Sequence, residues 1–406
     1  MGAPMANQTH QEAAVATLRL RRGEDRRLRA GHLWVYSNEV DTARTPLKGL
    51  EPGAPVLVLD HRGGVVGAGY ANPRSLICAR LVSHGRRLLD RRLLVERLRR
   101  ALALRERLFP APSYRLAFGE GDHLPGLVVD RYGETAVVQL TTAGMERMRE
   151  AVVAALAEVA GVRHVLARND TAVRALEGLA RYVEPWLGEP PPVVLVEEDG
   201  AVFEVDPAAG QKTGWFYDQR ANRRTAAALA RGARVLDVFS YVGGFGIRAA
   251  LAGAREVRCI DASEAALARL AANAERNGVA ARVRAERADA FEALEALAAE
   301  GARFDLVILD PPALIKRARD CKAGLAAYRR LNALGMAVTA EGGFLVSCSC
   351  SHHLEEEALR RVVREAARTQ GRAVQELAAA GQDMDHPVHP AMPETRYLKA
   401  LFLRVI

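Results

Sequence analysis

The chain has few lysines, few cysteines and no long apolar run among its 406 residues. Its five cysteines are an odd number without regular spacing, which argues against a disulfide-stabilised secreted protein and indicates a reducing compartment. No stretch approaches the ~18 uninterrupted apolar residues of a membrane helix. The start of the chain, residues 1–16, lacks the cationic and apolar segments of a signal peptide. We therefore expect a cytoplasmic protein that does not bind membranes.

Arginine carries almost all of the basic charge. Only five of the 57 basic residues are lysines, and the formal net charge is +8 with a pI of about 9.5. Arginine suits bidentate phosphate contacts and stacking on bases, so an anionic partner such as RNA is favoured. A GC-rich coding bias would produce the same excess without any partner, and composition leaves both explanations open. The lysines are Lys48, Lys212, Lys316, Lys322 and Lys399.

Turn residues and hydrophobic periodicity divide the chain into four parts. Residues 1–15 lack periodicity, which predicts a flexible tail. Residues 16–85 contain short apolar stretches between glycines and prolines, which predicts a small β-barrel whose arginines either contact RNA or form a solvated face. Residues 86–196 begin with an amphipathic helix at 86–108 and continue as a central α+β domain.

Strands and helices alternate in the last part, residues 197–406, which predicts an α/β fold with a parallel, doubly wound sheet. In such a sheet the ligand lies in the crevice beyond the carboxyl ends of the strands. The residues that follow each strand are therefore the candidates for binding and chemistry. We expect the strands at 235–239, 256–260, 282–284, 304–309, 343–347 and 399–405.

A glycine-rich stretch, VLDVFSYVGGFG at 235–246, opens this part and reads as strand, tight turn and helix. Glycines at Gly243, Gly244 and Gly246 allow positive φ and the close approach of a ligand. The stretch formally fits a dinucleotide fingerprint, with Asp261 after the second strand at about the expected spacing. The longer turn favours S-adenosylmethionine, whose methionine end needs no pyrophosphate seat on a helix N-terminus. A purely structural glycine turn is the third alternative.

The first three strands supply the candidate cofactor-binding residues. Asp261 could accept hydrogen bonds from both ribose hydroxyls or, alternatively, cap the next helix. Asp289 offers a carboxylate for the adenine edge, and Phe291 offers a ring for its face. The full set from these turns is Asp237, Phe239, Ser240, Tyr241, Gly243, Gly244, Asp261, Ala262, Ser263, Asp289, Ala290 and Phe291.

The fourth and fifth strands are followed by Asp310-Pro311-Pro312 and by Ser-Cys-Ser-Cys-Ser at 347–351. The two prolines make the first segment rigid. If these strands are adjacent, Asp310 and a thiol flank one small pocket, since neighbouring strands lie about 4.8 Å apart. This arrangement predicts methylation of a pyrimidine at C5, with Cys350 as the nucleophile on C6 and Asp310 as the partner of N3. The base must leave its stack to reach them.

Simpler roles exist for the other thiol and for nearby histidines. Cys348 is expected to be a packing residue at the strand end. A metal cluster at 348–353 lacks a second Cys/His group at ligand spacing, so we expect no metal site.

Several motifs together resemble the bacterial 23S ribosomal RNA cytosine-5 methyltransferases that carry an N-terminal PUA domain. The resemblance covers nearly the whole chain and implies a PUA barrel, a central domain and a Rossmann-like class I methyltransferase domain that uses S-adenosylmethionine. It also implies that Gln219 and Arg220 lie near the cofactor, and Asn277, Pro311 and Pro312 join the candidate cofactor set. The motifs are GHLWVYSNEV (31–40), TGWFYDQR (213–220), DVFSYVGGFG, DASEAAL, NAERNG (273–278), DPPALIK (310–316), SCSCS and DHPVHPAMPETRYLKALFLRV.

The resemblance implies that Cys350 is the nucleophile and that the partner is RNA, either 23S rRNA or a large-subunit assembly particle. Three rival functions stay open: methylation of another RNA atom such as a guanine exocyclic amine, a non-catalytic role in RNA binding or ribosome assembly, and dinucleotide-dependent oxidoreduction. The target nucleotide and the oligomeric state, including a homodimer, are not fixed by the sequence.

Overall fold

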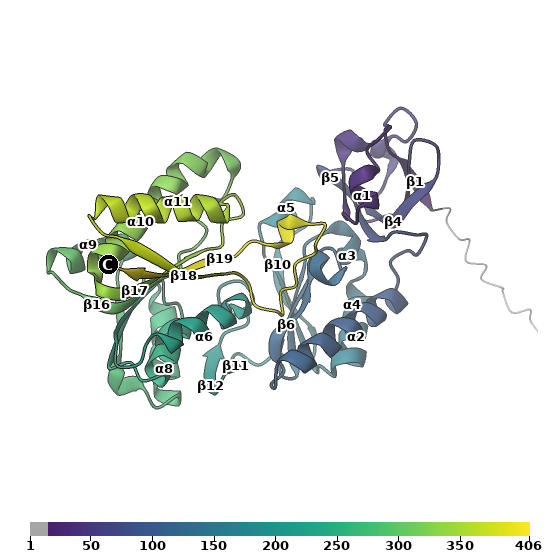
Figure 1. Ribbon diagram of the computed structural model, residues 1–406. Helices are drawn as coiled ribbons and strands as arrows, with labels where there is room; N and C mark the ends of the chain where they lie inside the picture. The colour runs from purple at the N-terminus through teal and green to yellow at the C-terminus, as the bar shows by residue number, and fades with distance from the viewer. Residues whose placement is uncertain (1–14) are drawn as a thin grey trace, which may run out of the picture.

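The computed structural model describes residues 15–406, so the expected tail at 1–15 lies outside the described residues apart from its last position. The described residues form three sheets of five, five and seven strands and one two-stranded sheet, and the first five-stranded sheet and the seven-stranded sheet lie at opposite ends of the molecule (Figure 1). The first sheet has the order β1-β3-β4-β5-β2, and its strands lie where the short apolar stretches predicted them. They are β1 (Ala16–Arg19), β2 (Trp34–Tyr36), β3 (Pro55–Leu59), β4 (Val65–Ala71) and β5 (Ile77–Ser83).

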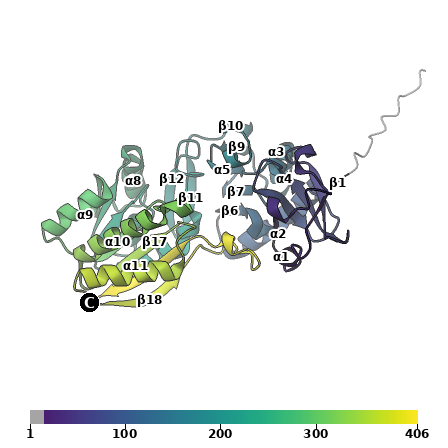
Figure 2. The ribbon, with the colours of Figure 1, turned by 90° about the horizontal axis from the view of Figure 1, so that it is seen from above.

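The central domain is a five-stranded sheet with the order β10-β9-β8-β7-β6, and helices α2 and α4 pack against each other beside it (Figures 1 and 2). Helix α2 begins at Arg91 rather than at residue 86, because the Asp90 side chain caps it by accepting a hydrogen bond from Leu93 N. Strands β6 and β10 were not expected from the sequence. The elements are α2 (Arg91–Leu108), β6 (Ser113–Phe118), β7 (Leu127–Tyr132), β8 (Thr135–Leu140), α3 (Ala143–Arg147), α4 (Arg149–Ala160), β9 (His164–Asn169), α5 (Val173–Leu176) and β10 (Tyr182–Leu187).

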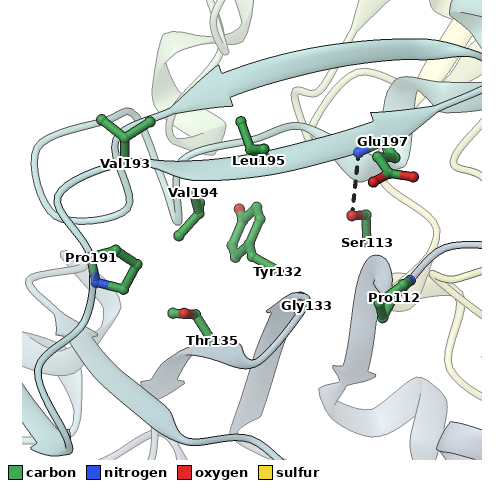
Figure 3. A pocket seen from close by; sticks show the side chains of 10 residues that line it. All are labelled: Pro112, Ser113, Tyr132, Gly133, Thr135, Pro191, Val193, Val194, Leu195 and Glu197. Atoms are coloured by element: carbon green, nitrogen blue, oxygen red, sulfur yellow. Dashed lines mark hydrogen bonds between the residues drawn. The ribbon is translucent and has the colours of Figure 1, made fainter.

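A two-stranded hairpin, β11 (Val194–Glu198) and β12 (Ala201–Val205), connects the central and C-terminal sheets. Its turn residues Asp199 and Gly200 both have positive φ, as a tight two-residue hairpin requires. Where the hairpin faces the central sheet, a cavity of about 270 Å³ remains, with Tyr132 and Val194 among its walls (Figure 3). The hairpin therefore forms part of the contact between the two domains.

The C-terminal sheet has seven strands in the order β15-β14-β13-β16-β17-β19-β18. The first five are parallel as predicted, but β19 runs antiparallel to β17 and β18, so the sheet is mixed. Strand β18 was not expected from the sequence. The elements are α6 (Arg220–Ala228), β13 (Arg234–Val238), α7 (Gly244–Leu251), β14 (Glu256–Asp261), α8 (Glu264–Arg276), β15 (Val283–Arg287), α9 (Ala290–Ala299), β16 (Phe304–Leu309), α10 (Cys321–Val338), β17 (Thr339–Ser349), α11 (Glu356–Thr369), β18 (Val374–Ala380) and β19 (Lys399–Val405).

One segment, residues 381–398 between β18 and β19, ties the three parts of the molecule together. It leaves the C-terminal sheet, runs to the central domain and returns (Figures 1 and 2). Arg105 of α2 donates to the Asp385 carbonyl, and Met392 is buried in the core of the first sheet. The tail motif of the sequence thus fixes the domains relative to one another.

No helix among residues 15–406 has the length and apolar composition needed to span a membrane.

A buried ion-pair network stabilises the junction between the hairpin and helix α6. Glu198 is 2% exposed and accepts two hydrogen bonds of 2.6 Å from Arg223. Trp215 also donates to it, and Arg220 lies 3.5 Å away. Because a carboxylate so deeply buried balances two guanidinium groups, its removal leaves uncompensated buried charge.

We expect Glu198→Ala to lower the free energy of unfolding by about 3–5 kcal/mol, as measured by urea titration. Glu197→Ala, which removes the exposed neighbouring carboxylate, is the control and should change stability by less than about 0.5 kcal/mol. Equal stability of the two variants would contradict the assignment of Glu198 as the centre of the network.

Candidate active site

The turn after β13 has an unusual backbone. Phe239 and Tyr241 have φ of 65° and 49°, and Gly243 has φ of 91°. Positive φ costs a non-glycine residue about 1–3 kcal/mol and is retained where surrounding structure enforces it, often at functional sites. Here the Tyr241 amide donates to Asp261 Oδ2 at 2.8 Å, and the Ser240 amide donates to the Ile260 carbonyl at 3.0 Å. Hydrogen bonds to the end of β14 therefore stabilise the unusual backbone of the turn after β13.

The three glycines of this turn all allow positive φ, but they have different roles in the structure. Only Gly243 has it. A Cβ on Gly246 would lie 2.5 Å from Cys259 Sγ, so this glycine lets α7 pack closely on β14. A Cβ on Gly244 would lie 3.2 Å from Arg223 Cδ and 3.3 Å from the Trp215 ring.

Two buried polar atoms at this turn have no protein partner among the described residues. They are Asp237 Oδ1 and Ser240 Oγ, whereas Asp237 Oδ2 accepts from Gly246 N at 2.8 Å. Burial, together with the negative charges of Asp310 and Asp261, raises the pKa of Asp237 to about 8, against the opposing effect of the hydrogen bond from Gly246 N. A ligand that brings a hydrogen-bond donor or a positive charge would satisfy these atoms.

Asp261, Asp289 and Phe291 lie at the carboxyl ends of the next two strands. The position of Asp261 is compatible with both predicted roles, binding of the ribose and capping of the next helix. Its Oδ1 accepts from Ser263 N at 2.9 Å, and its Oδ2 accepts from the Tyr241 amide. Asp289 caps α9 by accepting from the amides of Phe291 and Glu292. The Phe291 ring is half-buried, and the Arg330 guanidinium lies over it, 5.0 Å from the ring centre. Ala262 and Ala290 lie beside them in the same two turns.

Strands β16 and β17 are neighbours, as the proposed pairing of Asp310 with a thiol requires. Gln219 Nε2 donates to Asp310 Oδ1 at 2.8 Å, and Cys350 Sγ lies 4.0 Å from the Pro311 carbonyl oxygen. Pro311 is buried and Pro312 is exposed. The two strand ends thus place a carboxyl group and a thiol at the same edge of the sheet, and Gln219, just before α6, adds an amide to the carboxyl group.

The serines beside Cys350 fix its orientation. Tyr328 on α10 hydrogen-bonds Ser349 and Ser351, and Ser351 Oγ also accepts from Ile315 N at 3.1 Å. Cys350 stands between these two anchored serines and is half-buried, whereas Cys348 is 1% exposed within the core. Of the two thiols in this motif, Cys350 is therefore the one near the surface.

Charged groups around this pocket hold neighbouring carboxyl groups in different protonation states. Burial and the negative charge of Asp218 raise the pKa of Asp310 to about 7, against the opposing effect of Lys212. Burial would also raise the pKa of Asp218, but Lys212, His386 and the Tyr397 hydroxyl hold it below its usual range. Two nearby carboxyls with separated pKa values are typical of acid–base sites.

Two residues of the candidate cofactor set have other partners. Arg220 is buried, donates to the Ser113 carbonyl and stacks on Phe109, so its guanidinium joins the domains. Asn277 bonds both the amide and the carbonyl of Val202. It follows the last residue of α8, about 20 Å along the helix from the turn that holds Asp261. Gln219, in contrast, reaches the pocket through Asp310.

Residues 18–84 match the PUA-like domain family, and residues 127–404, about two thirds of the chain, match the S-adenosylmethionine-dependent methyltransferase family. A protein from Tolumonas auensis named Ribosomal RNA large subunit methyltransferase I is 35% identical over 397 residues, covering 96% of this chain and 99% of its own. A protein of the same name from Erwinia tasmaniensis is 36% identical over 396 residues, covering 95% and 98%. The chain belongs to the S-adenosylmethionine-dependent methyltransferase family.

Solved structures share the whole fold of this methyltransferase. A protein from Streptococcus mutans has a TM-score of 0.81 at 20% identity, covering 96% of this chain and 100% of that one. SMU.776, solved as a complex with SAH, has a TM-score of 0.82 at 20% identity with the same coverage. The family therefore confirms the expected cofactor, S-adenosylmethionine, and the unpartnered atoms of Asp237 and Ser240 fit a ligand with an amino group.

Sequence reasoning missed three residues of this methyltransferase that lie near Cys350 and Asp310. Asp218 lies within the TGWFYDQR motif, and Lys212 directly precedes it. Tyr397 belongs to the tail motif. Lys212 Nζ lies 3.4 Å from Asp218 Oδ2, and the Tyr397 hydroxyl donates to the same oxygen. The scarcity of lysine was the one signal in the sequence that could have drawn attention to Lys212.

We expect Asp261→Ala to weaken binding of S-adenosylmethionine about 10- to 100-fold, because hydrogen bonds to a charged group contribute about 1.5–3 kcal/mol. Titration calorimetry with the cofactor alone measures this. Asp305→Ala is the control, because Asp305 lies near the start of β16 at the opposite end of the strands. Affinity of Asp261→Ala within twofold of native would count against the ribose-binding role.

Proposed function

We propose that this methyltransferase forms 5-methylcytosine in large-subunit ribosomal RNA through a covalent adduct between Cys350 and C6 of the base. The observation that carries the proposal is the position of Cys350 Sγ 4.0 Å from the carbonyl oxygen of Pro311, the residue after Asp310, at the ends of the neighbouring strands β17 and β16. The names of the two relatives support ribosomal RNA as the substrate, and the PUA-like domain with its arginines supports RNA binding. We also propose domain limits of 16–85, 86–196 and 197–406.

The residues of the pocket divide the reaction among them. The Cys350 thiolate adds to C6 of the cytosine while Asp310, held by Gln219, gives its proton to N3, which makes C5 nucleophilic. When bound, S-adenosylmethionine would supply the electrophilic methyl group for C5 and would leave as S-adenosylhomocysteine. Loss of the C5 proton to a base then breaks the bond between C6 and Sγ and returns the thiolate. N3 gives its proton back to the Asp310 carboxylate, which restores the neutral aromatic base and the protonated acid.

The same geometry supports a distribution of roles among the cofactor-binding residues. We propose that Asp261 binds the ribose, that Asp289 and Phe291 contact the adenine, and that Asp237 and Ser240 bind the methionine end. Phe239, Tyr241, Gly243 and Gly244 supply backbone, while Ala262, Ser263, Ala290, Pro311 and Pro312 line the remaining turns.

The test is methyl transfer from labelled S-adenosylmethionine to 23S rRNA that lacks its own modification, with nucleoside analysis of the product. Label on C5 of cytosine is the expected result. Label on another atom, such as a guanine amine, would replace the cytosine-5 assignment. Transfer to assembled 50S particles but not to naked rRNA would identify the particle as the substrate.

A further inference from the structure

Lys399, the first residue of β19, is a buried cation without a carboxylate partner. The residue is 6% exposed and pairs with Ser349 across the β17–β19 ladder. Its Nζ donates to the carbonyls of Ser351 and Tyr397, each at 2.7 Å. Within residues 15–406, no carboxylate oxygen lies within 4.0 Å of this amine. Two carbonyls satisfy two of its three N–H groups, and the charge itself remains unpaired.

An unpaired buried charge is costly, so its presence needs a counter-ion that forms at some stage of the working cycle. Cys350 is the group placed to become one. It directly precedes Ser351, whose carbonyl holds the amine, and it interacts electrostatically with Lys399. Glu356, at the start of α11, is the other acidic group that acts on Lys399.

The composition of the chain strengthens this assignment. The chain has five lysines among 57 basic residues, and two of the five interact with Cys350: Lys212 lowers the pKa of the thiol, and Cys350 raises the pKa of Lys399. An ammonium is a compact point charge with rotatable donors, whereas a guanidinium is a wide planar fork.

We propose that Lys399 is a positioning residue that stabilises the thiolate of Cys350 as its fixed counter-ion. The proposal rests on the proposed role of Cys350 as nucleophile. When the thiol loses its proton to solvent, the negative charge on Sγ forms beside an ammonium already oriented by two carbonyls. Stabilisation by a preoriented group needs no reorganisation when the charge appears.

The protonation behaviour of Lys399 agrees with this role. Burial lowers its pKa to about 8, and Cys350 and Glu356 oppose that shift. The amine is therefore still charged at neutral pH, and formation of the thiolate would raise its pKa further. Burial raises the pKa of Cys350 and Lys212 opposes that rise, so a second cation would lower the pKa of the thiol further. The other charged or titratable groups around the pair are Lys212, Asp218, Asp310, Tyr328, His352, His353, Glu356 and Tyr397.

The test is the rate of alkylation of Cys350 by iodoacetamide as a function of pH, without RNA, followed by mass spectrometry of the peptide that contains Cys350. Lys399→Met and Lys399→Gln both remove the charge, and the glutamine amide keeps donors for the two carbonyls. We expect alkylation near neutral pH to fall about tenfold in both variants, because the pKa of the thiol rises by about one unit. Lys399→Arg, which keeps a positive charge, should recover part of the rate.

Lys322→Met is the matched control, since Lys322 lies in the exposed first turn of α10, and it should alkylate as native. Cofactor binding by each variant, measured by calorimetry, verifies that the fold is intact. Unchanged alkylation of Cys350 in a folded charge-free variant would overturn the proposal. Slower alkylation in the Lys399 variants, combined with full methyl transfer by Cys350→Ala, would support the ion pair and reject the covalent cytosine-5 mechanism. Failure of the Lys399 proposal is therefore distinguishable from failure of the proposed function.

Discussion

Cys350→Ala is expected to reduce methyl transfer to ribosomal RNA at least about 10³-fold, because C5 of a pyrimidine does not attack a methyl donor until a nucleophile occupies C6. Binding of S-adenosylmethionine should stay within about twofold of native, since the thiol lies beside Pro311 rather than in the turns after β13 and β14. Single-turnover methylation with labelled cofactor measures the first quantity, and calorimetry measures the second.

Cys348→Ala is the matched control for this experiment. Its thiol is almost completely buried in the core, so an RNA base cannot reach it. Burial also raises its pKa well above the usual value, so the thiol stays protonated. We expect a modest loss of stability, about 1 kcal/mol, and methyl transfer within about threefold of native. Activity that survives in Cys350→Ala and disappears in Cys348→Ala would exchange the two roles and reject the covalent assignment to Cys350.

The alternation of strands and helices was sufficient to predict the part of the site that lies at strand ends. Each parallel strand ends at the same edge of the sheet, so residues that follow strands in the sequence meet in space. Asp261 and Asp310 lie at this edge, as the rule predicts, and their roles in the site stay predictions. The adjacency of β16 and β17, stated in the sequence analysis as a condition, is confirmed by their pairing.

Residues that reach the site from outside the sheet order could not be predicted in this way. Tyr397 and Lys399 arrive through the segment 381–398, which follows β18, a strand whose exposed and alanine-rich sequence lacks an alternating pattern. Because β19 runs antiparallel, its first residue, rather than its last, lies at the ligand edge. No local periodicity contains that information, since it depends on contacts between distant segments.

The glycine turn and Arg220 show a second limit of sequence reasoning. A motif identifies where an unusual backbone or charge occurs, but packing decides what it does. Gly246 is needed for the contact between α7 and Cys259, and the positive φ falls on Phe239 and Tyr241, which are not glycines. Arg220 follows Gln219, which contacts Asp310, yet the side chain of Arg220 is used in the interface with the central domain.

Asp310→Asn is the second substitution with a large expected effect. The asparagine amide still donates a hydrogen bond to N3 but has no proton to transfer, so we expect methyl transfer to fall about 10²- to 10³-fold. Cofactor affinity and alkylation of Cys350 by iodoacetamide should change little by comparison. Steady-state methylation at saturating cofactor measures the loss. Full activity of Asp310→Asn would show that a hydrogen bond alone suffices and would remove the proton transfer from the mechanism.

The pH profile of kcat/KM distinguishes the proton donor from a simple hydrogen-bonding group. The reactive form has Asp310 protonated, with a pKa of about 7, and Cys350 as the thiolate, whose pKa is raised by burial. Below pH about 7, kcat/KM therefore rises with pH, because the fraction of thiolate rises. Between pH about 7 and the pKa of the thiol, the fraction of protonated Asp310 falls as the fraction of thiolate rises, so kcat/KM stays constant. In Asp310→Asn the rate should instead continue to rise up to the pKa of the thiol. Profiles of identical shape in the two proteins would exclude Asp310 as the acid, because only its titration produces the flat region.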